Sequence, residues 1–327
     1  MTSPVARSTA HRRRYTFAAG GILVAALAAT SACSTSAKSS GDGKSGVSAG
    51  GSGGGKVIRV VAAENFWGSI AAQIGGSHVK VTSIISNPDT DPHDYEPTAG
   101  DARTVATATY AIVNGIGYDA WAGKLLASNP SGQRTELDVG DLVGVEDGGN
   151  PHRWYSPDDV HKVIERITAD YKKADPADAG YFDARKDTFE TKTLGEYNSL
   201  VAGIKATYAG TPIGASESIV SPLADGLGLK MLTPYSFLNA ISEGSDPTAQ
   251  DKNTIDHQIA AKQIEVYVYN SQNATPDVQA QVKAARAKGI PVATVTETLT
   301  PAGASFQQWQ VTELKGLQRA LAEATGK

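Results

Sequence analysis

The sequence predicts an α/β protein of two lobes, each a parallel sheet flanked by helices, joined by one long linking helix. Strand-like and helix-like segments alternate along residues 57–327. This body of about 270 residues is long for one hydrophobic core and comfortable for two. Between the halves, the apolar residues of segment 176–208 recur on one face of a helix. At ~1.5 Å per residue that helix would reach nearly ~50 Å, which is enough to cross from one lobe to the other.

The first lobe is assigned to residues 57–175. Residues 57–62 (VIRVVA), 79–85 and 110–114 (YAIVN) are short apolar runs that predict buried strands. Residues 67–74 and 101–108 predict helices between these strands. Pro157 and the two aspartates after it predict the start of another helix, because proline suits the first helical position and acidic residues favour the helix N-terminus.

The linking helix is assigned to residues 176–209 and the second lobe to residues 210–327. In that lobe the strand candidates are residues 212–215, 265–269 (EVYVY) and 291–295 (PVATV). Helices are predicted at residues 221–227, 277–287 and 306–325. The two halves resemble each other only as α/β units, since no short internal repeat is present.

The first 32 residues have the layout of a secretory signal peptide. A basic stretch around Arg7 and residues 11–14 precedes the apolar run 16–30, which is shorter than the ~20 residues that span a bilayer. Small residues then precede Cys33, the single cysteine of the chain, as in a bacterial lipobox, although Thr30 stands where leucine is usual. We therefore expect lipidation of Cys33; a cleaved signal with a free thiol is the alternative.

Residues 33–56 follow the signal peptide and form a flexible tether rich in glycine and serine. The expected mature protein is extracytoplasmic and anchored to the cell membrane by its N-terminal lipid. Without the four arginines of residues 1–33, the 30 basic side chains fall to 26 against 34 acidic ones, a net charge of −8. This charge argues against a nucleic-acid partner.

Four side chains that could bind a metal follow predicted strands or precede a predicted helix. Since ligands of open α/β sheets bind outside the carboxyl ends of the strands, a crevice shared by the two lobes would collect them. Imidazole and carboxylate together suit first-row divalent metals. The four residues are His93 in DPHDYEP, His152 in NPHRW, Glu217 in GASE and Glu297 in VTET.

Each of these residues taken alone has a simpler interpretation, since a histidine in a polar loop is usually just solvated or hydrogen-bonded. The metal hypothesis depends on the whole set. The remaining histidines lack such a context and are predicted to be structural or surface residues: His11, His78, His161 and His257.

The segments DPHDYEPT, NPHRW, SESIVSPLADGLGL, VYNSQNATPDVQ and PVATVTETLTPAGASFQQW occur in this order after a lipoprotein leader. Together they resemble the metal-binding solute-binding lipoproteins of zinc and manganese ABC importers. The resemblance implies two Rossmann-like lobes with one divalent metal ion, Zn²⁺ or Mn²⁺, held between them as cargo. It implies His93, His152, Glu217 and Glu297 as ligands, with Glu297 standing where an aspartate is usual. It also implies a cognate ABC permease as partner.

The predicted ligand set carries a formal charge of −2, which would neutralise a divalent ion as it leaves water. Asp94, Glu96 and Asn150 are candidates for orienting the two imidazoles. The identity of the metal stays open, although the lack of a His-rich loop favours a manganese-capable or unselective site. We expect a monomer.

Two other functions are alternatives to a metal-binding solute-binding protein. A secreted zinc-dependent hydrolase would keep a coordination position open for water, and the HExxH and GxSxG motifs are absent. An organic-solute or adhesin-type binding protein would make the four residues incidental. The sequence therefore favours a binding protein that is not an enzyme.

Overall fold

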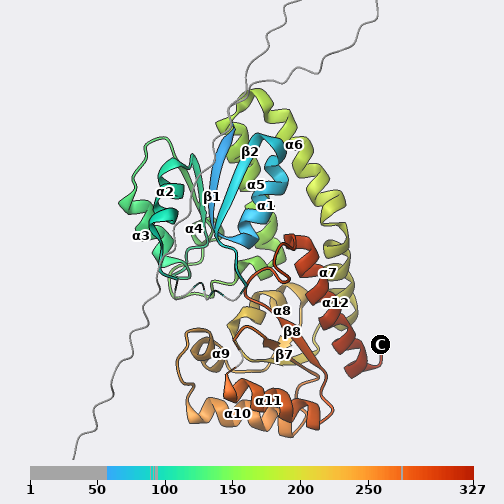
Figure 1. Cartoon of the computed structure of the whole chain (residues 1–327). Helices are drawn as coiled ribbons and strands as arrows, with labels where there is room; N and C mark the ends of the chain where they lie inside the picture. Colours follow the sequence, from blue (N-terminus) through green and yellow to red (C-terminus); the bar gives the residue numbers. More distant parts are fainter. Residues whose placement is uncertain (1–56, 89, 91, 93–94, 274) are drawn as a thin grey trace, which may run out of the picture. The chain divides into compact units, whose positions relative to one another are not determined.

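The computed structural model describes residues 57–88, 90, 92, 95–273 and 275–327. The predicted signal peptide, Cys33 and the tether lie outside these residues, as do His93 and Asp94. The described residues form two parallel sheets of four strands each, flanked by helices (Figure 1). The predicted fold class is therefore confirmed.

The first sheet has the strand order β2-β1-β3-β4. Its strands are β1 (Ile58–Glu64), β2 (Val79–Ile85), β3 (Tyr110–Val113) and β4 (Thr135–Asp138). Side chains alternate across β1: Val60 and Ala62 join the main hydrophobic core, while Val61 and Ala63 join smaller clusters on the opposite face. Helices α1 (Asn65–Gly75) and α5 (Pro157–Ala174) lie on the main-core side, and α2 (Ala99–Thr107) and α3 (Ala120–Ser128) on the other (Figure 1). The short helix α4 (Val139–Val143) follows β4.

The second sheet repeats this topology with the order β6-β5-β7-β8. Its strands are β5 (Pro212–Ala215), β6 (Lys230–Met231), β7 (Val266–Asn270) and β8 (Val292–Val295). The helices of this half are α8 (Ser221–Leu227), α9 (Tyr235–Ser242), α10 (Ala249–Ala260), α11 (Pro276–Ala287) and α12 (Phe306–Thr325). In both sheets the chain moves from the first strand to one neighbour and later returns to the other side. The carboxyl ends of β1 and β3, and of β5 and β7, are therefore the places where such sheets bind ligands.

The linking segment is helical along most of its length but is not the single regular helix that the spacing predicts. It consists of a 3₁₀ turn, η3 (Pro176–Asp178), then α6 (Ala179–Thr188), the π-helical turn η4 (Phe189–Thr193) and α7 (Gly195–Tyr208). The apolar spacing explains the π turn. The step of eight positions from Phe189 to Tyr197 exceeds two helical turns by almost one residue, and a wider turn absorbs the excess while both rings stay buried.

One hydrophobic core runs through both sheets and the linking segment, from Trp67 and Trp154 to Tyr197 and Phe306. Helix α6 packs on α1 and α5, and α7 packs on α12 and α8 (Figure 1). The lobes also approach closely at Gly226 of α8, where a Cβ atom would lie 2.6 Å from Cδ of Pro157. Such continuous packing favours small, local rearrangements over a wide hinge motion.

Candidate metal centre

The loop that carries His152 is held by the carboxyl end of β3. There the Asn114 side chain accepts a hydrogen bond from Trp67 Nε1 (3.1 Å) and donates one to the carbonyl of Pro151 (2.9 Å). Four residues after His152, Ser156 caps α5 by accepting from the backbone N–H of Asp159. The backbone on both sides of His152 is thus fixed by neighbouring elements.

The imidazole of His152 is almost fully buried, with 1% exposure. Its Nδ1 lies 2.9 Å from Oδ1 of Asn150, and its Nε2 lies 3.2 Å from Oε1 of Glu297. An amide oxygen only accepts, so Nδ1 is the nitrogen that donates to Asn150 and Nε2 is the nitrogen that faces the carboxylate. A proton or a metal ion between Nε2 and Oε1 would make this contact favourable.

Glu297 stands two residues after β8, and both of its oxygens are engaged. Oε1 accepts from the hydroxyl of Tyr118 (3.1 Å), and Oε2 accepts from Nδ2 of Asn270 (3.0 Å). Its backbone N–H donates to Oε1 of Gln272 (2.5 Å). Tyr118 comes from the first lobe and the other two residues from the second, so both lobes orient this carboxylate.

Glu217 follows β5 and is 2% exposed. Its Oε2 accepts from Nδ2 of Asn273 (3.1 Å) and from the hydroxyl of Ser242 (3.5 Å), whereas Oε1 is buried and has no hydrogen-bond partner. Burial, and then the nearby charge of Glu297, raise the pKa of Glu217 to about 8. A buried carboxylate oxygen without a partner is costly unless a proton or a metal ion meets it.

The structure brings His152 and Glu297 into contact and places Glu217 within reach of the charge of Glu297, but among the described residues the ligand atoms of these three do not all lie within 4.8 Å of one another. Ser218, directly after Glu217, places its hydroxyl 3.4 Å from Nδ1 of His152. His93 lies outside the described residues, so its role stays a prediction.

Described residues on both sides of position 93 make contacts with other elements. The carbonyl of Pro92 accepts from Nε1 of Trp121 (3.1 Å), and the carbonyl of Pro88 accepts from Nε2 of Gln272 (2.6 Å). The hydroxyl of Tyr95 donates to Asp101 of α2 (2.9 Å). Of the residues expected to orient the imidazoles, Asn150 does contact His152, Glu96 is exposed, and Asp94 is outside the described residues.

Sequence reasoning missed the residues that hold the two glutamates, namely Tyr118, Asn270, Gln272 and Asn273. Three of them lie at or just after the carboxyl end of β7, and that position is the signal that could have found them.

Two buried acids were also missed: Glu64, the last residue of β1, and Asp119, directly before α3. Both carboxylate oxygens of Glu64 are buried without a partner, and its pKa is raised well above the usual value by burial and then by Asp119. Asp119 accepts from the backbone N–H groups of Asn114 and Gly115, and burial raises its pKa to about 6. Glu64 also acts electrostatically on the hydroxyl of Tyr118, whose pKa is raised mainly by burial. Two further carboxyl groups therefore lie close to Tyr118, a residue that orients Glu297.

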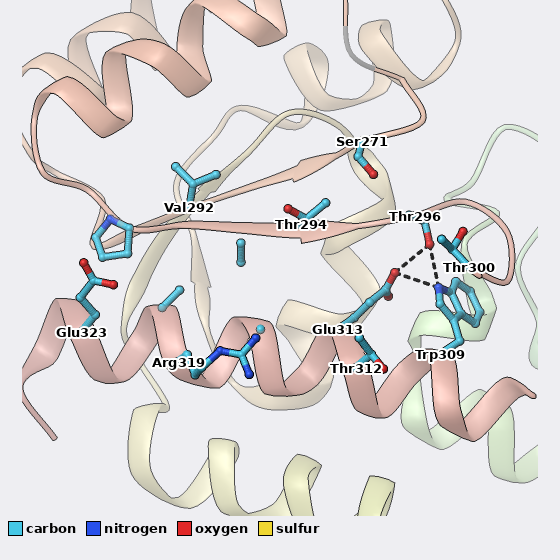
Figure 2. Close-up of a pocket in the computed structure, with 14 residues that line it drawn as sticks. Ser271, Val292, Thr294, Thr296, Thr300, Trp309, Thr312, Glu313, Arg319 and Glu323 are labelled. Atoms are coloured by element: carbon cyan, nitrogen blue, oxygen red, sulfur yellow. Dashed lines mark hydrogen bonds between the residues drawn. The ribbon is translucent and has the colours of Figure 1, made fainter. Parts of the chain in front are cut away.

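Behind the centre, Glu313 of α12 joins the two lobes. Figure 2 shows Glu313 reaching toward Thr296 at the end of β8, beside Trp309. Its Oε1 accepts from the hydroxyl of Thr296 (2.8 Å) and from Nε1 of Trp309 (2.8 Å), and its Oε2 accepts from the hydroxyl of Tyr155. Tyr155 also donates to the carbonyl of Thr296 (2.9 Å). Since Tyr155 is three residues after His152 and Thr296 precedes Glu297, this network positions both segments.

By chemical type, the described donor atoms suit a divalent transition metal. One imidazole nitrogen and two carboxylate oxygens are the mixed ligands that zinc and manganese accept. The two carboxylates supply a charge of −2, and the partnerless Oε1 of Glu217 would gain a partner on ligation. A divalent ion would replace the protons that these acceptors otherwise require.

We expect the metal-free protein to lose stability as the pH rises from 5 to 8.5. Burial raises the pKa of Glu313 to about 8, as for Glu217, so the folded state binds protons that the unfolded chain releases near its ordinary value of 4.5. The contribution of these bound protons to the free energy of unfolding is complete below that ordinary value and is lost as the pH rises through about 8. The melting temperature should fall by roughly 5 °C or more. Glu217→Gln should reduce the fall, while a melting temperature that rises over this range would contradict the assignment.

Residues 60–320 match the model of a family described as zinc-uptake complex component A, periplasmic. The manganese-binding lipoprotein MntA of Halalkalibacterium halodurans is 28% identical over 138 residues, which cover 41% of this chain and 46% of that protein. The zinc-binding lipoprotein AdcA of Streptococcus pneumoniae is 24% identical over 277 residues, or 76% of this chain and 52% of that one. The chain thus spans about half the length of these two relatives.

A solved structure is similar over the whole described body. The manganese-bound periplasmic metal-binding protein of Candidatus Liberibacter asiaticus has a TM-score of 0.66 at 19% identity, covering 81% of this chain and 99% of that one. At this identity the similarity shows the fold, which agrees with the two four-stranded sheets.

Proposed function

Because the chain belongs to the zinc-uptake complex component A family, we propose that it is an extracytoplasmic solute-binding protein for a divalent transition-metal ion. It captures one ion, zinc or manganese, between its two lobes and delivers it to an ABC importer in the membrane. The ligands are His152, Glu217 and Glu297, with His93 as the fourth.

One observation carries this proposal: a buried imidazole from the first lobe faces a buried carboxylate from the second, and a second buried carboxylate lies close enough to be affected by its charge. Nε2 of His152 lies 3.2 Å from Oε1 of Glu297, and the charge of Glu297 helps to raise the pKa of Glu217. The first residue comes from the loop before α5, and the two glutamates follow β5 and β8. A metal ion bound to all three would compensate the buried charge and connect the lobes.

The two carboxylates and the imidazole support both zinc and manganese as cargo. Affinity in such a site rises from manganese toward copper and stays high at zinc, so zinc should bind more tightly in vitro. The relatives carry both names, since one is a manganese-binding and another a zinc-binding lipoprotein. The cargo in the cell follows from which metal is available as well as from affinity.

The alternative of a secreted zinc hydrolase receives no support from the comparisons, since the family is one of metal uptake. It also fits the contacts less well. Four protein ligands would leave little room for the metal-bound water that hydrolysis requires.

Delivery requires the permease to distinguish the loaded from the empty protein. The continuous core favours a local change, and the contacts of Glu313 with Tyr155 and Thr296 join the two ligand segments to α12. The permease would therefore recognise the metal-bound protein through small shifts of α12 and the nearby loops. We propose that the receptor acts as a monomer.

We further propose that a lipid on Cys33 anchors the protein to the membrane. Two of the relatives are named lipoproteins, which supports this proposal. Among the described residues, no helix combines the length and the apolarity that crossing a bilayer requires. The tether of residues 33–56 would then keep the metal-binding body close to its permease.

Replacing Cys33 with Ser should move the protein from the membrane fraction to the soluble fraction. The zinc affinity of the body should not change, because the tether separates the anchor from the metal centre. Fractionation followed by immunoblotting measures the first effect, and zinc titration of the released protein measures the second. Full membrane retention of the variant would contradict the anchor.

The proposed function is tested by a thermal shift of the purified full chain. Zinc and manganese should each raise the melting temperature, because a ligand that binds only the native state stabilises it by about 2.7 kcal/mol at a hundredfold excess over its dissociation constant. Magnesium is the control, since it prefers all-oxygen ligands and retains its waters. A melting temperature that neither zinc nor manganese changes would refute the proposed function.

A further inference from the structure

A second cluster of metal-binding side chains lies at the opposite end of the first sheet from the candidate metal centre. His78 ends the 3₁₀ turn η1 (Gly76–His78) directly before β2, Asp175 follows α5, and Asp178 ends η3. One ligand atom from each residue lies within 4.8 Å of the other two. Because β2 has seven residues, at ~3.3 Å each, the cluster is about 20 Å from the carboxyl edge of the sheet.

The geometry of the cluster leaves one carboxylate oxygen without a partner. Nδ1 of His78 lies 3.2 Å from Oδ2 of Asp178 and 4.0 Å from Oδ2 of Asp175. The Asp175 side chain is 13% exposed, and its Oδ2 is buried with no hydrogen-bond partner. A single N–H on Nδ1 can serve Asp178, but at 4.0 Å it cannot serve Asp175.

The charge of the cluster also remains unbalanced without a cation. Two carboxylates exceed the single positive charge that a protonated His78 can supply. Within the described residues, both aspartates pair with His78, and neither forms an ion pair with a lysine or an arginine. The nearby guanidinium of Arg185 donates instead to the carbonyl of Gln73. A divalent ion with a neutral imidazole would balance the two carboxylates.

The imidazole of His78 is held in place by neighbouring aromatic rings. Tyr181 lies over it with ring centroids 4.1 Å apart, and Phe182 meets its edge at 5.7 Å. The hydroxyl of Tyr181 accepts from the backbone N–H of Ser77 (3.2 Å), which fixes the Tyr181 ring in turn. A ligand that is oriented before the metal arrives loses less freedom on binding.

We propose that His78, Asp175 and Asp178 form a second site for a divalent first-row transition-metal ion, with water completing its coordination. Two ligand atoms that are each ~2.1 Å from one ion can be at most ~4.2 Å apart, so the separations of 3.2 and 4.0 Å fit zinc. Asp178 is the most exposed of the three and can rotate to close the site. The ion would tie the α5–α6 corner, where the linking segment begins, to the α1–β2 corner of the first lobe.

The test uses the full chain with Glu217→Ala and Glu297→Ala combined, which removes the principal centre. This background should still bind about one zinc ion per chain in equilibrium dialysis. Adding His78→Ala should abolish that binding, and adding Asp175→Asn should weaken it at least tenfold. Cobalt should give the visible absorption bands of a low-symmetry site in the background and lose them with His78→Ala.

His161→Ala is the matched control, because His161 also faces one carboxylate, Glu190, at 3.4 Å but has no second one recorded beside it. It should leave the zinc of the background unchanged. A background that binds no zinc, or whose zinc survives His78→Ala, overturns the second site and leaves the proposed function standing. If instead His78→Ala alone removes all zinc from the otherwise unaltered chain, the second site stands and the proposed principal centre fails.

Discussion

Changing Glu217 to Ala is expected to weaken zinc binding by at least roughly a hundredfold, and His152→Ala and Glu297→Ala should do the same. Loss of a residue that only orients a ligand already costs about 10- to 100-fold in metal affinity, so loss of a ligand should cost more. Because all three complete one coordination sphere, two changes together should cost less than the sum of the single changes. Competitive zinc and manganese titrations measure both effects.

Two further variants separate ligation from general damage. Glu297→Asp should keep part of the affinity, since an aspartate is usual at this position among the proteins that the sequence resembles. His257→Ala should bind like the unaltered chain, because His257 is exposed on α10. If Glu297→Ala kept normal affinity while Glu217→Ala and His152→Ala lost it, Glu297 would not be a ligand.

The second large effect is expected at Glu313. Glu313→Ala would take one acceptor from each of the buried donors of Tyr155, Thr296 and Trp309. Each donor keeps one other acceptor, so the loss per hydrogen bond is about 0.5–1.5 kcal/mol. With the cavity left by the side chain, we expect a total loss of roughly 2–4 kcal/mol in the free energy of unfolding. Zinc affinity should fall about tenfold, because Thr296 adjoins Glu297 and a residue that orients a metal ligand carries an effect of this size.

Glu313→Gln distinguishes a positioning role from simple packing. Burial raises the pKa of Glu313 to about 8, so near pH 7 the residue is largely neutral and an amide can replace it. The variant should retain most zinc affinity and should lose part of the decline in stability between pH 5 and 8.5. Glu323→Ala is the control, since Glu323 is exposed on α12 and lines the same surface pocket as Glu313 (Figure 2). A Glu313→Ala protein as stable as the Glu323→Ala protein would contradict the network.

Much of the fold could be predicted because its strands and helices have clear patterns. The bounds predicted for β2, β5, α8 and α12 agree with the structure. Several elements were missed, among them α3, α9 and three that are especially short or polar. β6 has two residues, β4 buries a single side chain of TELD, and α10 (AQDKNTIDHQIA) buries only three of its twelve residues. Tertiary contacts, rather than local pattern, stabilise these elements.

The candidate site was predictable where a residue type and a strand end coincide, as for Glu217 after β5. The partners of these residues were not, because their contacts exist only in the folded chain. Tyr118 and Glu297 are 179 positions apart, and Tyr155 and Glu313 are 158 apart. In the same way, His78 stands in a polar turn of the sequence, but the fold sets it beside two aspartates from the end of α5 and from η3.

Anomalous X-ray diffraction at the zinc edge from zinc-loaded crystals tests most directly whether one divalent ion is bound by ligands from both lobes. We expect an anomalous peak within about 2.0–2.2 Å of Nε2 of His152, Oε1 of Glu217 and a carboxylate oxygen of Glu297. Zinc at the cluster of His78 would be an additional peak at the far end of the first sheet. A fully loaded crystal with no peak between Glu217 and Glu297 would contradict binding of the ion between the lobes.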